Sequence, residues 1–248
     1  GYIFEYEQLQ GELEATQMQL AEAQEEVRAG QEAVEENRRY EQLLGFAEDH
    51  SDYVMEQARI TSWNASNFEH GFMISKGSSS GIEVGDAVID ETGALVGQVT
   101  EVATSSATVS TVIDVNTRIG ALVGTNGSAA MLVGDYALMR QGQVSVTWLT
   151  EGAQLFLDDD ILTSGSGDQI PSGLVIGTVT SIQTEAAGQT DYGIITPSAN
   201  LDSLVQVFII KDFGQSSDSS GQDTTPEASP SPSPDVSPQP SVTPTTEG

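Results

Sequence analysis

The amino-acid sequence predicts a mainly β protein: an N-terminal coiled-coil helix, two small β-barrel subdomains and a disordered Pro/Ser/Thr-rich tail. Three observations support this. Residues 1–47 are rich in Glu, Gln and Ala and contain no proline. Residues 54–213 consist of short Val-, Ile- and Thr-rich runs separated by Gly, Asn and Asp. Residues 214–248 hold seven of the nine prolines. Each segment thus has the composition of a different kind of structure.

The first segment carries a heptad repeat, which predicts a dimeric coiled coil. With position a at Tyr6, every seventh residue as far as Val34 is apolar, whereas the d positions after Leu9 hold Thr, Ala, Gly and Asn. Small d residues bury little area, so we expect a marginal dimer. The expected dimer contacts are Tyr6, Leu9, Leu13, Leu20, Val27 and Val34.

A single amphipathic helix lying on the following domain is the alternative for this segment. Near its end the apolar set shifts to a broader stripe, which should dock on the β segment in either case. The residues of that stripe are Tyr40, Leu43, Leu44 and Phe46.

The second segment contains about a dozen predicted strands, spaced as in an all-β sandwich or a set of small barrels. They are Ala58–Ser62, Gly71–Ser75, Ala87–Ile89, Ala94–Val102, Ala107–Val112, Ile119–Val123, Ala129–Val133, Tyr136–Met139, Val144–Leu149, Asp160–Thr163, Leu174–Gln183, Tyr192–Thr196 and Leu204–Lys211. The clearest pairing is a hairpin of Leu174–Gln183 with Tyr192–Thr196.

A weak similarity between two runs of this segment predicts two related barrels. Gly93–Val102 parallels Gly173–Ile182, and each run has a mid-strand glycine of the kind that marks a bend or bulge in a small barrel. We expect the second barrel around roughly residues 115–200; chance resemblance among Val/Gly-rich strands is the alternative. The glycines expected to shape the turns are Gly77, Gly81, Gly85, Gly97, Gly165, Gly173 and Gly177.

The composition excludes several classes of function. The chain has 37 acidic and 8 basic residues, a formal charge of -29, whereas nucleic acids and anionic lipids require clustered Lys and Arg. It has no cysteine, so thiolate chemistry is excluded, and it has no run of about 18 apolar residues. The proline-rich tail cannot bury enough apolar surface to order itself, and we expect a solvated spacer, with a Pro-rich ligand as the alternative.

Candidate chemistry in the sequence is sparse. We expect His50 to lie at a solvated helix end and His70 in a turn, and the Gly-spaced serines of Ser164–Gly167 lack the spacing of a nucleophile loop. Asp158–Asp160 is a candidate Ca²⁺ ligand set without EF-hand spacing, so we expect a solvated acidic turn. The sequence therefore predicts no catalytic residue, no cofactor and no metal site.

The order of several motifs in the β segment resembles the MreC family. Lys76–Val88 is similar to its Lys-Gly and Gly-spaced turn and strand, and Gly93–Val102 to its following Gly-Leu-Val-Gly strand. Asp114–Thr117 fits its Asp-Pro-Asn-Ser turn, with Val115 in place of proline. Asp160–Val179, with Thr-Ser-Gly, Pro and paired glycines in order, is the most specific match. Glu36–Gly45 resembles the end of the family's helix.

This resemblance implies a non-enzymatic scaffold of the bacterial cell-elongation complex, which maintains cell shape by self-associating and by organising peptidoglycan synthesis. It implies a single-pass protein whose transmembrane helix would precede Gly1 and whose barrels lie on the extracytoplasmic face. The partners it implies are a second copy of the chain, a class B penicillin-binding transpeptidase, RodA, MreD and MreB.

Two other readings are open. A periplasmic adaptor of an efflux or secretion system also combines a helical stalk with β pieces, but it places a helical hairpin within a lipoyl-like domain, and here no returning helix is predicted. An enzyme acting on the cell wall is the third, because carboxylate pairs cannot be located from sequence.

Overall fold

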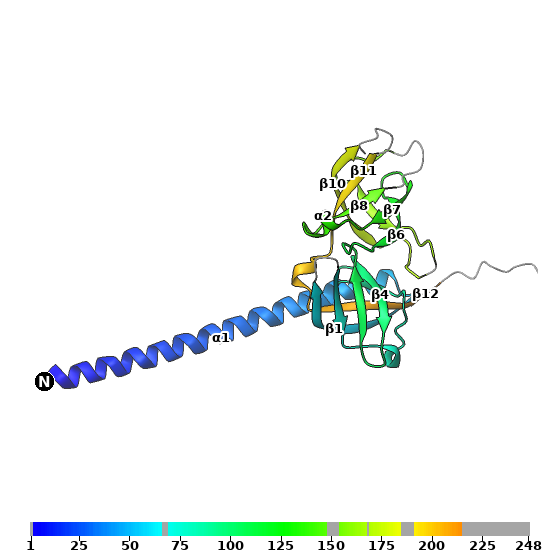
Figure 1. The fold of residues 1–248 in the computed structure, drawn as a ribbon. Helices are drawn as coiled ribbons and strands as arrows, with labels where there is room; N and C mark the ends of the chain where they lie inside the picture. The colour runs from blue at the N-terminus through cyan, green and yellow to red at the C-terminus, as the bar shows by residue number, and fades with distance from the viewer. Residues whose placement is uncertain (1, 66–68, 148–153, 168, 185–190, 215–248) are drawn as a thin grey trace, which may run out of the picture. The chain divides into compact units, whose positions relative to one another are not determined.

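The protein is described here by a computed structural model that covers residues 2–65, 69–147, 154–167, 169–184 and 191–214. Residues Gly1–Gly214 form one compact unit. The second unit, Gln215–Gly248, contains all but the first residue of the predicted disordered tail and lies outside the described residues. The chain begins with one long helix, α1 (Tyr2–Asp49), and continues almost entirely as strands (Figure 1).

The first six-stranded barrel is closed in the order β1-β12-β3-β4-β5-β2, with every neighbouring pair antiparallel. Its strands are β1 (Tyr53–Ala65), β2 (His70–Ile74), β3 (Ala87–Ile89), β4 (Leu95–Val102), β5 (Ala107–Thr111) and β12 (Gln206–Phe213). A 3₁₀ turn, Ser78–Ser80, follows β2. The last strand of the described chain therefore completes a barrel that five early strands began.

The second barrel is inserted between β5 and β12 and is closed in the order β10-β11-β8-β7-β6-β9. Its strands are β6 (Arg118–Val123), β7 (Ala129–Val133), β8 (Val144–Thr147), β9 (Asp160–Thr163), β10 (Val175–Thr184) and β11 (Asp191–Pro197). A short helix, α2 (Tyr136–Met139), precedes β8, and a 3₁₀ turn, Leu201–Ser203, precedes β12. The prediction of a mainly β fold with a helix and two barrels is confirmed.

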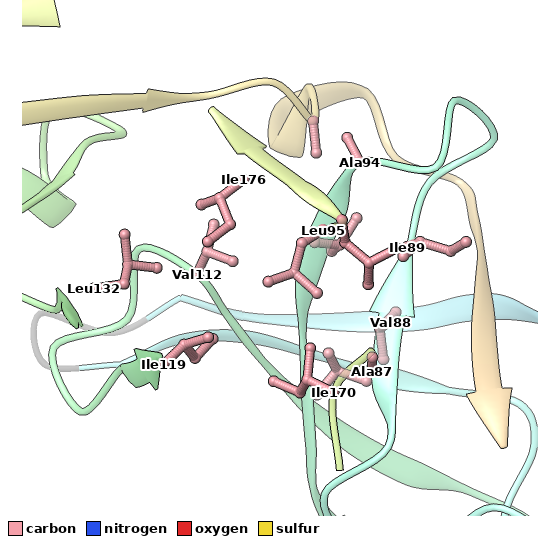
Figure 2. Packing of buried hydrophobic residues seen from close by; sticks show 14 of the residues in the cluster. Ala87, Val88, Ile89, Ala94, Leu95, Val112, Ile119, Leu132, Ile170 and Ile176 are labelled. Atoms are coloured by element: carbon pink, nitrogen blue, oxygen red, sulfur yellow. The ribbon is translucent and has the colours of Figure 1, made fainter. Parts of the chain in front are cut away.

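Both barrels are filled by side chains that point inward from every second residue of a strand. In β6, Ile119, Ala121 and Val123 are buried while the residues between them are not, which is the period-two pattern of a strand with one face in a core. The buried apolar residues form one cluster, and Figure 2 shows some of them, including Leu95 from the first barrel and Leu132 and Ile176 from the second. Strands of this kind each bury only a few side chains, so closure of the barrels supplies the continuous core.

Gly97 and Gly177, the mid-strand glycines of the two similar runs, both lie where a neighbouring strand comes very close. A Cβ atom on Gly97 would lie 2.1 Å from the carbonyl oxygen of Ser110 on β5, and one on Gly177 would lie 2.2 Å from that of Thr196 on β11. The register shifts near both, between Val88 and Ile89 opposite Gly97 and between Val175 and Gly177. Neighbouring backbones approach closely at these points because glycine has no side chain. Of the other expected turn glycines, those with positive φ are Gly81, Gly85, Gly165 and Gly173.

One predicted strand is wrong. Tyr136–Met139 forms the helical turn α2 and not a strand, because the carboxylate of Asp135 accepts hydrogen bonds from the backbone N–H groups of Ala137 and Leu138. This N-cap satisfies donors that a strand would have offered to a neighbour. The predicted strand Val144–Leu149 is β8 as far as Thr147, and its last two residues lie outside the described residues.

Candidate interaction surfaces

A stripe of exposed large apolar side chains runs along α1. All six residues expected to form the dimer contacts are exposed, by between 58% and 67%: Tyr6, Leu9, Leu13, Leu20, Val27 and Val34. Large apolar side chains repeated at heptad spacing on a solvated helix are typical of a helix that packs against another helix. We therefore treat this stripe as the first candidate site.

The charges of α1 lie mostly outside this stripe. In the same heptad register the e positions are Gln10, Gln17, Gln24, Gln31 and Arg38, and acidic residues fill outer positions at Glu7, Glu14, Glu22, Glu25, Glu32, Glu35 and Glu36. Arg28 and Arg38 form ion pairs with glutamates of their own helix, three or four residues away. The g row on the other flank carries Glu5, Glu12 and Glu26. In a parallel pair a g row faces the partner's e row, which carries no acid, so a strongly acidic helix can still pack against a copy of itself.

The end of α1 is fixed to the first barrel by an aromatic cluster. The rings of Phe46 and His50 are stacked 4.2 Å apart, and Tyr53 of β1 lies 4.7 Å from His50. A Cβ atom on Gly93 would lie 2.2 Å from the Phe46 ring, so Phe46 fits over a bare piece of backbone. Phe46 and Leu43 pack against the core as expected, whereas Tyr40 and Leu44 of the predicted docking stripe are exposed.

His50 is therefore not simply the solvated helix end that we expected. Its Nδ1 lies 3.0 Å from the carbonyl oxygen of Phe46, in the last turn of α1, and its ring is half-buried between two aromatic residues. This contact caps the helix where the chain turns into β1. It joins the helix to the barrel and gives His50 a structural part.

Hydrogen bonds of His70 and Asp114 join the start of β2 to the segment that leads from β5 into the second barrel. Asp114 is 3% exposed; one carboxylate oxygen accepts a hydrogen bond from His70 N–H at 2.7 Å and the other from Asn116 N–H at 2.8 Å. The Thr111 hydroxyl donates to the His70 carbonyl at 2.9 Å and lies 2.8 Å from His70 Nδ1. The resemblance placed a turn at Asp114–Thr117, and here its aspartate anchors β2. His70 begins β2 and does not lie in a turn, so that expectation is wrong.

A cavity of about 680 Å³ lies beside this group of hydrogen-bonded residues. Its lining includes the polar residues His70 and Asp202 and the buried apolar residues Ile113, Met139 and Leu201. Burial lowers the pKa of His70, although the nearby carboxylates of Asp114 and Asp202 oppose the shift. Among the described residues, His70 is not part of a catalytic triad of nucleophile, base and orienting group. The hydroxyl beside its ring belongs to Thr111 and already donates to the His70 carbonyl.

The remaining candidates for chemistry are structural in the described chain. Ser164 Oγ lies 2.9 Å from Ser166 Oγ, within a turn that has Gly165 and Gly167 at positive φ, as expected for a tight glycine turn. The acidic turn is only partly solvated, because Asp159 is 4% exposed and accepts a hydrogen bond from Phe156 N–H. Among the described residues no three His, Asp or Glu side chains are grouped so as to hold a metal ion.

Sequence reasoning missed one exposed feature, the adjacent side chains of Phe156 and Leu157. They belong to the short apolar run, residues 155–157, that precedes the three aspartates, but nothing in the sequence distinguishes an exposed Phe-Leu pair from a buried one. Within the described residues no helix combines the length and apolar character that crossing a membrane requires.

A long helix joined to two closed six-stranded barrels is the class of protein that this fold defines. The comparisons give the family. A model of the family "Rod shape-determining protein MreC, barrel core" matches residues 60–211, and the chain belongs to this family. The predicted resemblance is confirmed, and the relatives below are named for cell shape and not for an enzymatic activity.

A cell shape-determining protein MreC of Listeria monocytogenes is 31% identical over 202 residues, covering 77% of this chain and 66% of the relative. The chain thus spans just under two thirds of that relative. A solved structure of MreC from Listeria monocytogenes is 27% identical, with a TM-score of 0.58 over 79% of this chain and 97% of that one.

A second solved structure is described as a complex between penicillin-binding protein (PBP2) and MreC from Helicobacter pylori. It is 15% identical with a TM-score of 0.50, over 64% of this chain and 100% of that one, so the likeness shows the fold alone.

Proposed function

We propose that the chain is a non-enzymatic scaffold of the bacterial cell-elongation machinery, which maintains cell shape by self-associating through α1 and by holding a class B penicillin-binding transpeptidase. The observation that carries the proposal is the row of six large apolar side chains left exposed on α1. A scaffold needs a surface for self-association that is separate from the surfaces for other proteins, and α1 and the barrels provide two distinct kinds of surface.

The closed barrels limit how partners bind. All twelve strands belong to closed sheets, so within the described chain no strand edge is left for an added strand. Contacts of the barrels with the transpeptidase therefore use side chains. RodA, MreD and, across the membrane, MreB are further partners of the full-length protein. We place the barrels on the extracytoplasmic face of the membrane, with a single transmembrane helix as the anchor of the full-length protein.

Two measurements test the proposal. Sedimentation of the purified chain at several concentrations should show a dimer that dissociates on dilution, because the d row is small. Immobilised chain should retain the purified class B transpeptidase of the same bacterium, and an unrelated acidic β protein should not. A monomer at all concentrations together with no retained transpeptidase would refute the proposal.

A further inference from the structure

The turn between β8 and β9 exposes two adjacent large apolar side chains. Phe156 and Leu157 are 55% and 59% exposed, whereas Leu155 before them is half-buried against the core. A single exposed apolar residue is ordinary, but an adjacent Phe-Leu pair at a turn tip presents a compact apolar surface to solvent.

Hydrogen bonds hold the turn firmly. The buried carboxylate of Asp159 accepts from Phe156 N–H at 2.8 Å, and Asp159 N–H donates to the Phe156 carbonyl at 3.3 Å. Val179 of β10 brackets the same turn, since its carbonyl accepts from Asp158 N–H at 2.9 Å and its N–H donates to the Asp159 carbonyl at 3.0 Å. The turn is therefore part of the second barrel.

A side-chain anchor adds to these bonds. A Cβ atom on Gly193 of β11 would lie 2.6 Å from a methyl carbon of Leu155, so Leu155 packs directly onto that strand. Leu155 points into the barrel, and the two residues after it are carried outward. Partners bind more tightly to side chains that are already held in place, because little conformational freedom is lost.

The turn also contains an unusual backbone conformation. Asp158 has φ 66°, and it is the one non-glycine residue with positive φ in the described chain. Asp and Asn tolerate this left-handed region best, yet glycine is the residue that adopts it without strain. A strained conformation fixed by surrounding bonds, with apolar side chains held in solvent, is typical of a binding surface.

Charge identifies the partner. The exposed residues Asp158 and Asp160 come directly after the apolar pair in the chain, and the sequence has no Lys or Arg from residue 141 to residue 210. A partner must therefore bring its own cations to this rim. A second copy would set the same carboxylates against each other, and an anionic lipid surface would repel them.

We propose that Phe156 and Leu157 form a docking point for a folded protein surface that offers an apolar pocket rimmed by Lys or Arg. The inference rests on the proposed function, in which that protein is the class B transpeptidase. Phe156 and Leu157 fill the pocket, and Asp158 and Asp160 pair with its basic rim. Aromatic anchors seated in a partner's pocket dominate the energetics of many interfaces.

The test is the affinity of the full chain for the purified class B transpeptidase of the same bacterium, measured by titration. A variant with Phe156→Ser and Leu157→Ser should bind at least about tenfold more weakly. A matched control, Met73→Ser with Val84→Ser, removes two exposed apolar side chains from the first-barrel region and should bind as the wild type does. A variant with Asp158→Asn and Asp160→Asn should bind more weakly and with a smaller dependence on salt.

The outcomes separate the two proposals. If the wild type does not bind the transpeptidase, the transpeptidase part of the proposed function fails and this inference fails with it. If the wild type binds and the Phe156/Leu157 variant binds equally well, the docking point is wrong while the proposed function stands. A loss of sedimenting dimer, or of binding to phosphatidylglycerol vesicles, confined to this variant would assign the surface to a second copy or to lipid and would overturn the inference.

Discussion

The ammonium group of Lys211 on β12 lies 3.2 Å from a carboxylate oxygen of Glu56 on β1, although the two residues are 155 positions apart. The other oxygen of Glu56 lies 2.9 Å from Lys76, so both lysines of the chain bind one carboxylate. Lys211 also donates to the carbonyl of Ser80 at 2.9 Å. These bonds join the first strand, the last strand and the loop after β2 where the barrel closes.

The first prediction concerns this carboxylate. Its hydrogen bond to Lys76 holds the pKa of Glu56 below its usual value, against the effect of burial. Glu56→Gln should lower the free energy of unfolding by about 1 kcal/mol at neutral pH, less than is usual for hydrogen bonds to charged groups because the site is partly solvated. A group with a lowered folded pKa stabilises above its unfolded pKa and loses that contribution as the pH falls through the folded pKa.

The difference between wild type and Glu56→Gln should therefore shrink as the pH falls below 4.5, the unshifted value. Urea denaturation at pH 7 and at steps below pH 4.5 measures it. Glu101→Gln removes an exposed carboxylate from β4 and should leave the stability unchanged. A difference that stays constant down to low pH would contradict the role given to Glu56.

The second prediction concerns the stripe of α1. Leu13→Asp with Leu20→Asp places carboxylates at two a positions and should abolish dimerisation, while the strand signal in circular dichroism stays unchanged. Met18 is the matched control, because it is 76% exposed on the same helix but occupies an outer f position. Met18→Asp should leave the dimer intact. Sedimentation that is unchanged in the double variant would show that copies meet through the barrels.

The third prediction concerns the close approach of β4 and β5. Gly97→Ala would place a Cβ atom 2.1 Å from the Ser110 carbonyl, and the strand backbones would have to separate. We expect a loss of about 3 kcal/mol or more, comparable to severe overpacking of a core. Gly142→Ala is the control: nothing lies within 4 Å of its Cβ, so only its positive φ of 70° opposes alanine. It should cost about 1 kcal/mol, as measured by urea denaturation.

The sequence predicted those parts of the fold in which a local period coincides with burial. The helix runs through all the heptads, and the predicted strand Ile119–Val123 forms as β6, one residue longer at its start. The two mid-strand glycines, Gly97 and Gly177, lie where strands approach closely. Tyr136–Met139 shows the limit, because four apolar residues fit a strand or a helical turn equally well. A single neighbouring carboxylate, that of Asp135, decided between them.

The candidate surfaces were predictable only in part. The α1 stripe depends on spacing within one helix, so its residues could be named from sequence. The exposure of Phe156 depends on bonds from Asp159 and from Val179, which belongs to a strand more than twenty residues further on. Likewise, Asp159 was expected in a solvated turn and is buried, because its partner is a backbone N–H whose position only the folded barrel sets.

The last prediction concerns His70. The Thr111 hydroxyl has one proton, and it donates that proton to the His70 carbonyl, so the neutral imidazole must donate from Nδ1 to Thr111. Burial lowers the pKa of His70, which means that the unfolded chain binds a proton before the folded chain does as the pH falls. Stability should therefore fall as the pH drops below 6.5, the unshifted value, until the folded pKa is passed. Urea denaturation at pH 7.5 and at pH 6 measures the fall.

His70→Asn keeps a donor near the position of Nδ1 but cannot titrate, so its stability should change less over this interval, whereas His50→Asn should retain the fall. If His70→Asn showed the same fall as the wild type, another group would be responsible for it.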